Sequence, residues 1–218
     1  MRVPARMGRR ESGVTVLELL VGSVVMVVFL AAVSASFGVT LKIWQISGPT
    51  AELDSQSFRA IEQIAGRLMR AGDGTIFPAA AAPTGSSSIS FRTAEGLSGA
   101  QAVWGEEIEY SFALDPNELE DGADNDNDGL IDEGMVIWRK NPGTAQEVWG
   151  ILARGVAPYL EGETDNGVDD NGNGLVDERG FSVVREGELI TVRMTLMRSI
   201  RDGEAAIRTV STTIRIRN

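Results

Sequence analysis

The feature that most constrains this chain is an apolar segment near its N-terminus, residues 19–41, which contains no charged side chain. An α-helix rises about 1.5 Å per residue, so this segment reaches roughly 35 Å, enough to cross a bilayer. The residues before it are rich in arginine, with Arg2, Arg6, Arg9 and Arg10. Because cytoplasmic flanks carry an excess of basic residues, the pattern predicts a cytoplasmic N-terminus and a body on the other side of the membrane.

One acidic residue, Glu18, stands at the start of this apolar segment. A carboxylate there is costly unless a cation pairs with it. Glu18 ends a short run that follows basic residues and precedes the apolar segment: Gly13-Val14-Thr15-Val16-Leu17-Glu18. This run resembles the prepilin motif of type IV pilins and type II secretion pseudopilins. The family usually has Phe at the first mature position, where this chain has Val14.

The resemblance implies a processing pathway and a set of partners. A prepilin peptidase would cut after Gly13 and methylate the new N-terminus at Val14. Glu18 would then pair with the α-amine of a neighbouring subunit, since an intramembrane carboxylate needs a cation. The expected partners are other pilins or pseudopilins, the peptidase and the inner membrane. The expected location is a single-pass inner-membrane protein with a periplasmic C-terminal domain, associated with a filament after assembly.

Two simpler interpretations of the N-terminus stay open. One is a secretory signal peptide with an A-x-A-like site at Val33-Ser34-Ala35, cleaved before Ser36. The charge of Glu18 inside the apolar region argues against it. The other is an anchor helix that is never cleaved.

The chain divides into four expected segments. Residues 50–72 show apolar side chains at helical spacing, including Leu53, Phe58, Ile61 and Ile64. Because proline removes a backbone hydrogen bond, Gly48-Pro49 predicts a kink or break in the helix. The segments are a cleaved basic leader at 1–13, a transmembrane and assembly helix at 14–47, an amphipathic stalk helix at 50–72 and a sheet domain at 80–218, which opens with a small-residue linker at 80–87.

The sheet domain shows alternating apolar and polar residues separated by turn signals, which predicts antiparallel hairpins. The expected fold class is therefore α+β, a long N-terminal helix with a membrane-spanning first half, packed on an antiparallel sheet in a pilin-like roll. This order is similar to PilW/PulJ-type minor pilins and minor pseudopilins. The residues that carry this likeness are Phe58–Ile64 running into Arg70-Ala71-Gly72, and the closing Thr213–Asn218.

Two Asp-rich segments, 121–133 and 166–178, repeat without a gap, so that Asp124 corresponds to Asp169. Oxygen-bearing side chains at alternate positions, followed by glycine and another carboxylate, suit a hard cation such as Ca²⁺. The first segment matches an EF-hand loop through its fifth ligand, but Met135 stands where the final Glu belongs. It resembles instead the short Asp-rich calcium repeats of secreted bacterial proteins. The candidate ligands are Asp124, Asp126, Asp128, the carbonyl of Leu130, and Asp132 or Glu133 in the first loop, and Asp169, Asn171, Asn173, Leu175, Asp177 and Glu178 in the second.

Two other interpretations of these loops are a solvated turn and a magnesium site. Solvated Asn/Asp/Gly turns use the same residue types. Magnesium fits less well, because it demands tight octahedral geometry and keeps its water. The second loop has Asn171 and Asn173 where the first has Asp, so we expect calcium at 121–133 and weaker binding at 166–178.

Composition narrows the function classes. The chain has no histidine and no cysteine, which removes the usual Ser-His-Asp, thiol and imidazole-zinc chemistry. Its net charge of −11 disfavours binding to nucleic acid. We therefore expect a structural subunit of a type II secretion pseudopilus or type IV pilus rather than an enzyme. The alternative is a membrane-anchored, calcium-dependent binding module.

Overall fold

The structure is a computed structural model that describes residues 13–78, 85–201 and 204–216, with the backbone alone at 38–47, 49 and 201. The chain divides into two units, Met1–Gln45 and Ile46–Asn218. Most of the expected leader, residues 1–12, lies outside the described residues, and so does the 80–84 part of the expected linker.

Helix α1 (Val16–Leu68) contributes residues to both units and continues through Gly48-Pro49. The break expected at this dipeptide is therefore absent, and one helix begins at Val16, within the expected range 14–47, and ends at Leu68, within the expected range 50–72. Proline withholds only one backbone N–H, so the hydrogen bonds before and after it can carry the helix across.

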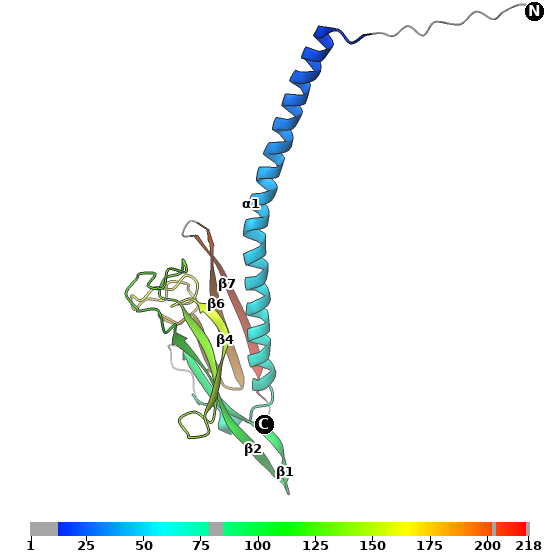
Figure 1. Ribbon diagram of the computed structural model, residues 1–218. Helices are drawn as coiled ribbons and strands as arrows, with labels where there is room; N and C mark the ends of the chain where they lie inside the picture. Colours follow the sequence, from blue (N-terminus) through cyan, green and yellow to red (C-terminus); the bar gives the residue numbers. More distant parts are fainter. Residues whose placement is uncertain (1–12, 79–84, 202–203, 217–218) are drawn as a thin grey trace, which may run out of the picture. The chain divides into compact units, whose positions relative to one another are not determined.

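After α1 comes a short 3-10 helix, η1 (Asp73–Thr75), and then the strands of a single antiparallel sheet (Figure 1). The antiparallel sheet that the alternation predicts is therefore present. The strands are β1 (Ser88–Ser98), β2 (Gln101–Leu114), β3 (Gly134–Lys140), β4 (Val148–Val156), β5 (Phe181–Glu186), β6 (Leu189–Arg201) and β7 (Glu204–Arg215).

The strands pair mainly with their neighbours in sequence, in the order β1-β2-β3-β4-β6-β5, and β7 also pairs with β6. Strand β7 pairs along nearly the whole length of β6, from Leu189 to Arg201. Strands β5 and β4 therefore share the other edge of β6, where β4 contributes the single pair Val156–Leu196. This arrangement brings the connection after β2 and the connection after β4 to the same end of the sheet (Figure 1).

The core of the second unit lies between one face of α1 and the sheet. Alternate strand residues and helix residues spaced by three or four point into it, as the periodicities predict. Each fully buried large apolar side chain contributes about 1.5–3 kcal/mol to folding. The most deeply buried include Leu53, Ile64 and Leu68 of α1 with Phe91, Tyr110, Val136, Phe181 and Met194 of the sheet.

Phe58 departs from the expected apolar face of the helix. Half of this residue is exposed, whereas Ser57 is fully buried and donates its hydroxyl to the carbonyl of Asp54 at 2.8 Å. The guanidinium of Arg208 on β7 lies 5.9 Å from the centre of the Phe58 ring. The α1 face that meets the sheet is therefore rotated away from Phe58, which packs under an arginine at the edge.

Candidate metal centre

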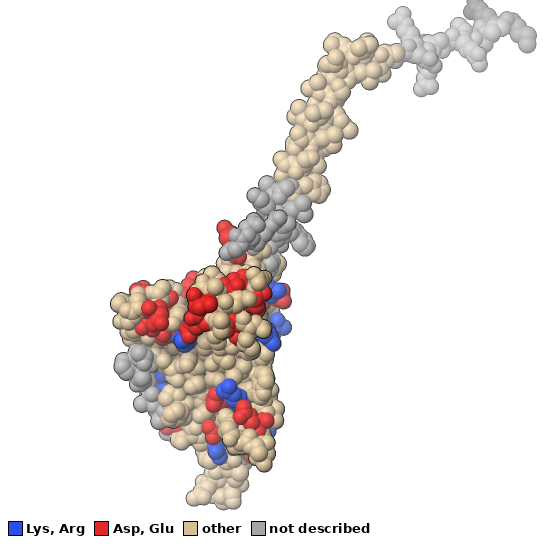
Figure 2. All heavy atoms as spheres, turned by 60° about the vertical axis from the view of Figure 1, so that its left-hand side comes forward, with Lys and Arg blue, Asp and Glu red and all other residues tan. Residues whose placement is uncertain are grey.

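The two acidic loops occupy equivalent places in the chain, and each is closed by a backbone hydrogen bond. In the first loop, residues 115–133, the N–H of Asp115 donates to the carbonyl of Glu133 at 3.1 Å. In the second loop, residues 160–178, the N–H of Leu160 donates to the carbonyl of Glu178 at 2.9 Å. The structural repeat therefore begins six residues before the sequence repeat. Figure 2 shows Asp and Glu side chains crowded at the loop end of the sheet domain.

The first Asp of each motif organises its loop. Asp124 accepts the N–H of Gly129 at 2.9 Å, and Asp169 accepts the N–H of Gly174 at 2.8 Å. The two glycines have φ values of +90° and +89°, which residues with a side chain rarely adopt. The motif glycine is therefore required by the turn that brings the acidic side chains together.

Asp132 and Asp177, both expected as ligands, are engaged elsewhere. Their carboxylates accept the backbone N–H groups at the start of their own loops, including those of Gly122 and Gly167 at 2.9 Å. Both aspartates have positive φ, at +52° and +51°. In the described geometry these two side chains hold each loop closed, which leaves the neighbouring glutamates to face the acidic cluster.

Five carboxylates of the first loop form two overlapping groups that could hold a metal ion. Oxygens of Asp124, Asp126 and Asp128 lie within 4.8 Å of one another, and so do oxygens of Glu118, Asp126 and Glu133. Carboxylate oxygens converging at such spacing suit a hard divalent cation. Four of these residues were expected from the motif, and Glu118 was not.

Glu118 is 3% exposed, and its Oε1 accepts the backbone N–H groups of Asn125 and Asp126, each at 3.0 Å. Its counterpart in the second loop is Glu163, which is 6% exposed and accepts the N–H of Asn171 at 3.0 Å. Both glutamates lie outside the Asp-rich motif. The signal that would have found them is the same 45-residue offset, extended toward the N-terminus.

Charge and burial act together on Glu133. Burial raises the pKa of this carboxyl to about 7, and the nearby negative charges of Asp128, Glu118 and Asp126 add to the effect. A buried carboxyl among other carboxylates is costly to ionise. The cluster is therefore electrostatically suited to a cation, which would remove this cost.

The second loop has fewer charges and more internal hydrogen bonds. The side-chain amide of Asn173 donates to Oε1 of Glu178 at 2.8 Å, and the N–H of Asp177 donates to Oε2 of Glu163 at 3.1 Å. Asn173 stands where the first loop has Asp128. An N–H donor thus takes the place that a cation would occupy next to Glu178.

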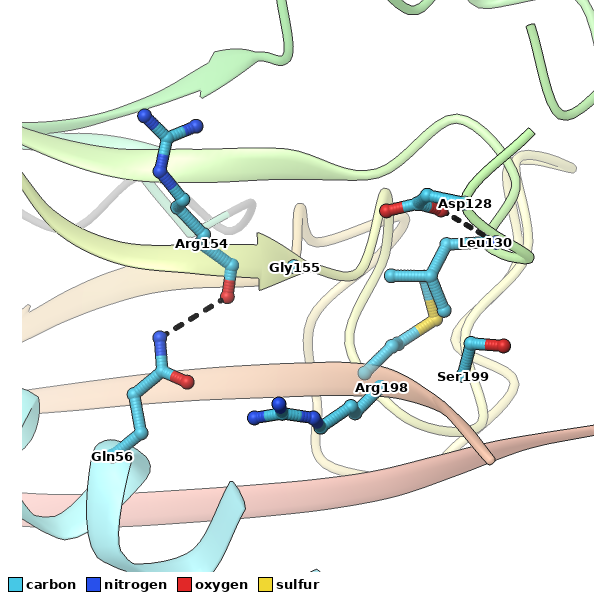
Figure 3. Close-up of a pocket in the computed structure, with 8 residues that line it drawn as sticks. Gln56, Asp128, Leu130, Arg154, Gly155, Arg198 and Ser199 are labelled. Carbon is cyan, nitrogen blue, oxygen red and sulfur yellow. Dashed lines mark hydrogen bonds between the residues drawn. The ribbon is translucent and has the colours of Figure 1, made fainter. Parts of the chain in front are cut away.

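The two motif leucines anchor the loops. Leu130 and Leu175, whose carbonyls were expected as ligands, are 6% and 8% exposed, and their N–H groups donate to Asp128 and Asn173. Figure 3 shows Asp128 and Leu130 beside Gly155 of β4. A buried leucine at this position fixes each loop to the sheet.

A polar pocket of about 330 Å³ adjoins the first loop, lined by Asp128, Gln56, Arg154 and Arg198 among others (Figure 3). Asp128 is exposed to solvent, whereas Glu118 and Glu133 are buried. The acidic cluster is therefore open on the side of Asp128 and closed on the side of the two glutamates.

The N-terminal site residues lie at the start of α1. Gly13 and Val14 precede the helix and are exposed. Oε2 of Glu18 accepts the N–H of Thr15 at 2.9 Å and its hydroxyl at 3.0 Å, while the Thr15 hydroxyl accepts the N–H of Glu18 at 3.3 Å. This reciprocal pair is a capping box. Glu18 therefore already serves the helix N-terminus within its own chain.

The helical segment Val16–Phe37 is long and apolar enough to cross a membrane, and it lies exposed rather than buried in the described part of the chain. A signal sequence near the N-terminus also meets this criterion of length and composition. An apolar helix without protein cover needs an apolar environment, which lipid or neighbouring helices would supply.

Comparison with known proteins gives no relative. No model of a known protein family, no curated protein and no solved structure matches this chain.

Proposed function

We propose that this protein is a prepilin-type structural subunit, a PilW/PulJ-type minor pilin or minor pseudopilin of a type IV pilus or type II secretion pseudopilus. The observation that carries this function is Glu18, a carboxylate at the beginning of an exposed apolar helix and five positions after Gly13. The α+β arrangement of one N-terminal helix and an antiparallel sheet supports the same function.

In this function the helix has two successive environments. Peptidase cleavage after Gly13 frees the α-amine of Val14 on the cytoplasmic side, while the apolar helix stays in the inner membrane and the sheet domain lies in the periplasm. During assembly, Glu18 exchanges part of its capping box for the α-amine of a neighbouring subunit. The new contact places opposite charges together in a medium of low dielectric constant, where their attraction is strong.

The two acidic loops bind calcium in this proposal, and the ions stabilise the sheet domain. Calcium accepts six to eight oxygen ligands in flexible geometry, which suits a loop of carboxylates, side-chain amides and carbonyls. The first loop binds more tightly, because five carboxylates converge there. Binding to the folded state alone increases stability by mass action.

The mass of the N-terminus tests the processing step. We expect the chain recovered from membranes to begin at a methylated Val14, as measured by intact mass and peptide sequencing. A chain that begins at Ser36 would identify a secretory signal peptide, and one that keeps Met1 would identify a plain anchor. Either result would overturn filament assembly and leave an anchored or secreted calcium-dependent binding module as the function to examine.

A further inference from the structure

Two carboxylate oxygens in the first loop are buried without a hydrogen-bond partner. Oε2 of Glu118 and Oε2 of Glu133 are both shielded from solvent and unpaired among the described residues. Each residue is only 3% exposed. A buried polar atom without a partner is costly, and an ionised carboxylate is more costly still, so such atoms point to a ligand that supplies positive charge.

The two glutamates that carry these oxygens belong to one cluster. Glu118, Glu133 and Asp126 each direct a carboxylate oxygen into a space where these atoms lie within 4.8 Å of one another. Ligand oxygens around calcium lie 2.3–2.6 Å from the ion, so opposite ligands are separated by about 5 Å. The spacing of the three oxygens therefore fits one calcium-sized ion.

We propose that Glu118 is a cation ligand from outside the Asp-rich motif and that, with Glu133, it supplies the carboxylate that the loop lacks at its last position. Glu163 is the counterpart of Glu118 in the second loop, where backbone N–H groups occupy both of its carboxylate oxygens. This inference rests on the calcium binding proposed above, and it adds the residues that close the inner side of the site.

The geometry of Glu118 fits a ligand held in place before the ion arrives. Its Oε1 accepts the N–H groups of Asn125 and Asp126, which fixes the carboxylate and leaves Oε2 without a hydrogen bond among the described residues. Because Asn125 and Asp126 lie inside the motif, the same contact fixes Glu118 to the loop. Preorganised ligands lose less conformational freedom on binding.

The second loop repeats this arrangement only in part. Oε2 of Glu178 is buried and unpaired within the described ranges, and Glu163 accepts backbone N–H groups through both oxygens. With Asn171 in place of Asp126, fewer negative charges face the ion. The class of ligand is the same, and the affinity is lower.

The test is a calcium titration of the full chain in detergent micelles, by isothermal calorimetry after chelation of bound metal. Glu118→Gln keeps the shape and the acceptor oxygen for the two N–H groups but removes the charge. Asp121→Asn is the matched control, because the second loop already has Asn166 at that position with the equivalent hydrogen bond. We expect Glu118→Gln to weaken the tighter site by roughly tenfold or more, and Asp121→Asn to leave it unchanged.

Thermal unfolding provides the second measurement. In EDTA we expect Glu118→Gln to melt at the same temperature as the wild type or higher, because it removes a buried charge, and in calcium we expect it to melt lower. A variant that only disturbs packing would melt lower in both. If the wild type binds calcium and the Glu118→Gln and Asp121→Asn variants bind it equally well, Glu118 is not a ligand, although the calcium site itself stands. No binding by the wild type would overturn the calcium site itself, and neither outcome bears on filament assembly.

Discussion

Arg179, directly after the last glutamate of the second acidic loop, forms an ion pair with Glu120 of the first. The hydrogen bond between them lowers the pKa of the Glu120 carboxyl and raises the pKa of the Arg179 guanidinium. The guanidinium also lies 4.9 Å from the centre of the Tyr159 ring. The side chain of Arg179 therefore joins the two loops and packs on Tyr159, the residue directly before the second loop.

Arg179→Gln should destabilise the protein by about 1 kcal/mol, because it removes a partly exposed ion pair and the cation–π contacts with Tyr159 and Phe112. Chemical denaturation measures the change. Glu120→Gln removes the ion pair but leaves the ring contacts, so it should cost less. Equal losses in the two variants would mean that the ring contacts contribute nothing.

Glu18 offers a separation of two roles. Glu18→Gln retains the capping box, because Gln also accepts the backbone N–H at this position, but its neutral amide cannot form an ion pair with an amine. Thr15→Val removes the cap hydroxyl and keeps the charge. We expect Glu18→Gln to abolish incorporation into filaments and Thr15→Val to permit it, with both chains inserted in the membrane.

Filament preparations analysed by immunoblot, with membrane fractions as the loading control, measure both variants. Incorporation of Glu18→Gln at the wild-type level would contradict pairing between subunits and leave Glu18 with helix capping alone.

Asn173→Asp should strengthen calcium binding at the second loop. It replaces the amide that donates to Glu178 with a carboxylate, as Asp128 provides in the first loop. Calorimetry should show the weaker of two binding steps tighten, and stability in EDTA should fall because two carboxylates now face each other. An unchanged weaker step would show that the second loop binds no ion.

The raised pKa of Glu133 predicts how the stability of the metal-free protein depends on pH. The pKa of this carboxyl is about 7 in the folded protein, against an ordinary value of 4.5. Its contribution to stability is thus fully present below pH 4.5 and is lost as the pH rises through 7. In EDTA the melting temperature should be higher near pH 6 than near pH 8. Glu133→Gln should reduce this difference, and an identical difference in the variant would contradict the assignment.

Gly180 lies where the chain leaves the second loop, against the backbone of Ala157. A Cβ at Gly180 would meet the carbonyl oxygen of Ala157 at 1.9 Å. Gly180→Ala should therefore destabilise the fold by about 1–3 kcal/mol, as overpacking does. Gly66→Ala in α1 is the control, because a Cβ there meets nothing within 4 Å and alanine favours helix. Denaturation midpoints that fell equally in both would contradict the close approach.

Much of the sheet could be predicted from the sequence, because strand alternation and turn residues are local signals. The candidate metal ligands could be predicted only in part. Glu118 and Glu163 lie in ordinary polar sequence, and only folding brings them under the motif. Asp132 has the spacing of a ligand, but its backbone has a positive φ and its carboxylate accepts the N–H groups of Asp121 and Gly122. Phe58 matched the apolar period, yet the neighbouring Ser57 faces the core. In each case the deciding contact joins residues that local pattern cannot relate.

The hydrogen bonds that close the acidic loops also separate them from the rest of the sheet. Leu114, the last residue of β2, pairs with Gly134, the first residue of β3, and the next hydrogen bond, from Asp115 to Glu133, already seals the first loop. The second loop is sealed in the same way at Leu160 and Glu178. Strands β2 and β3 thus receive the first loop as though it were a tight turn. Strands β4 and β5 both pair with β6, so the second loop instead crosses the strand between them. The first loop is therefore the insert that can be shortened or exchanged for another turn without altering the register of the strands that hold it.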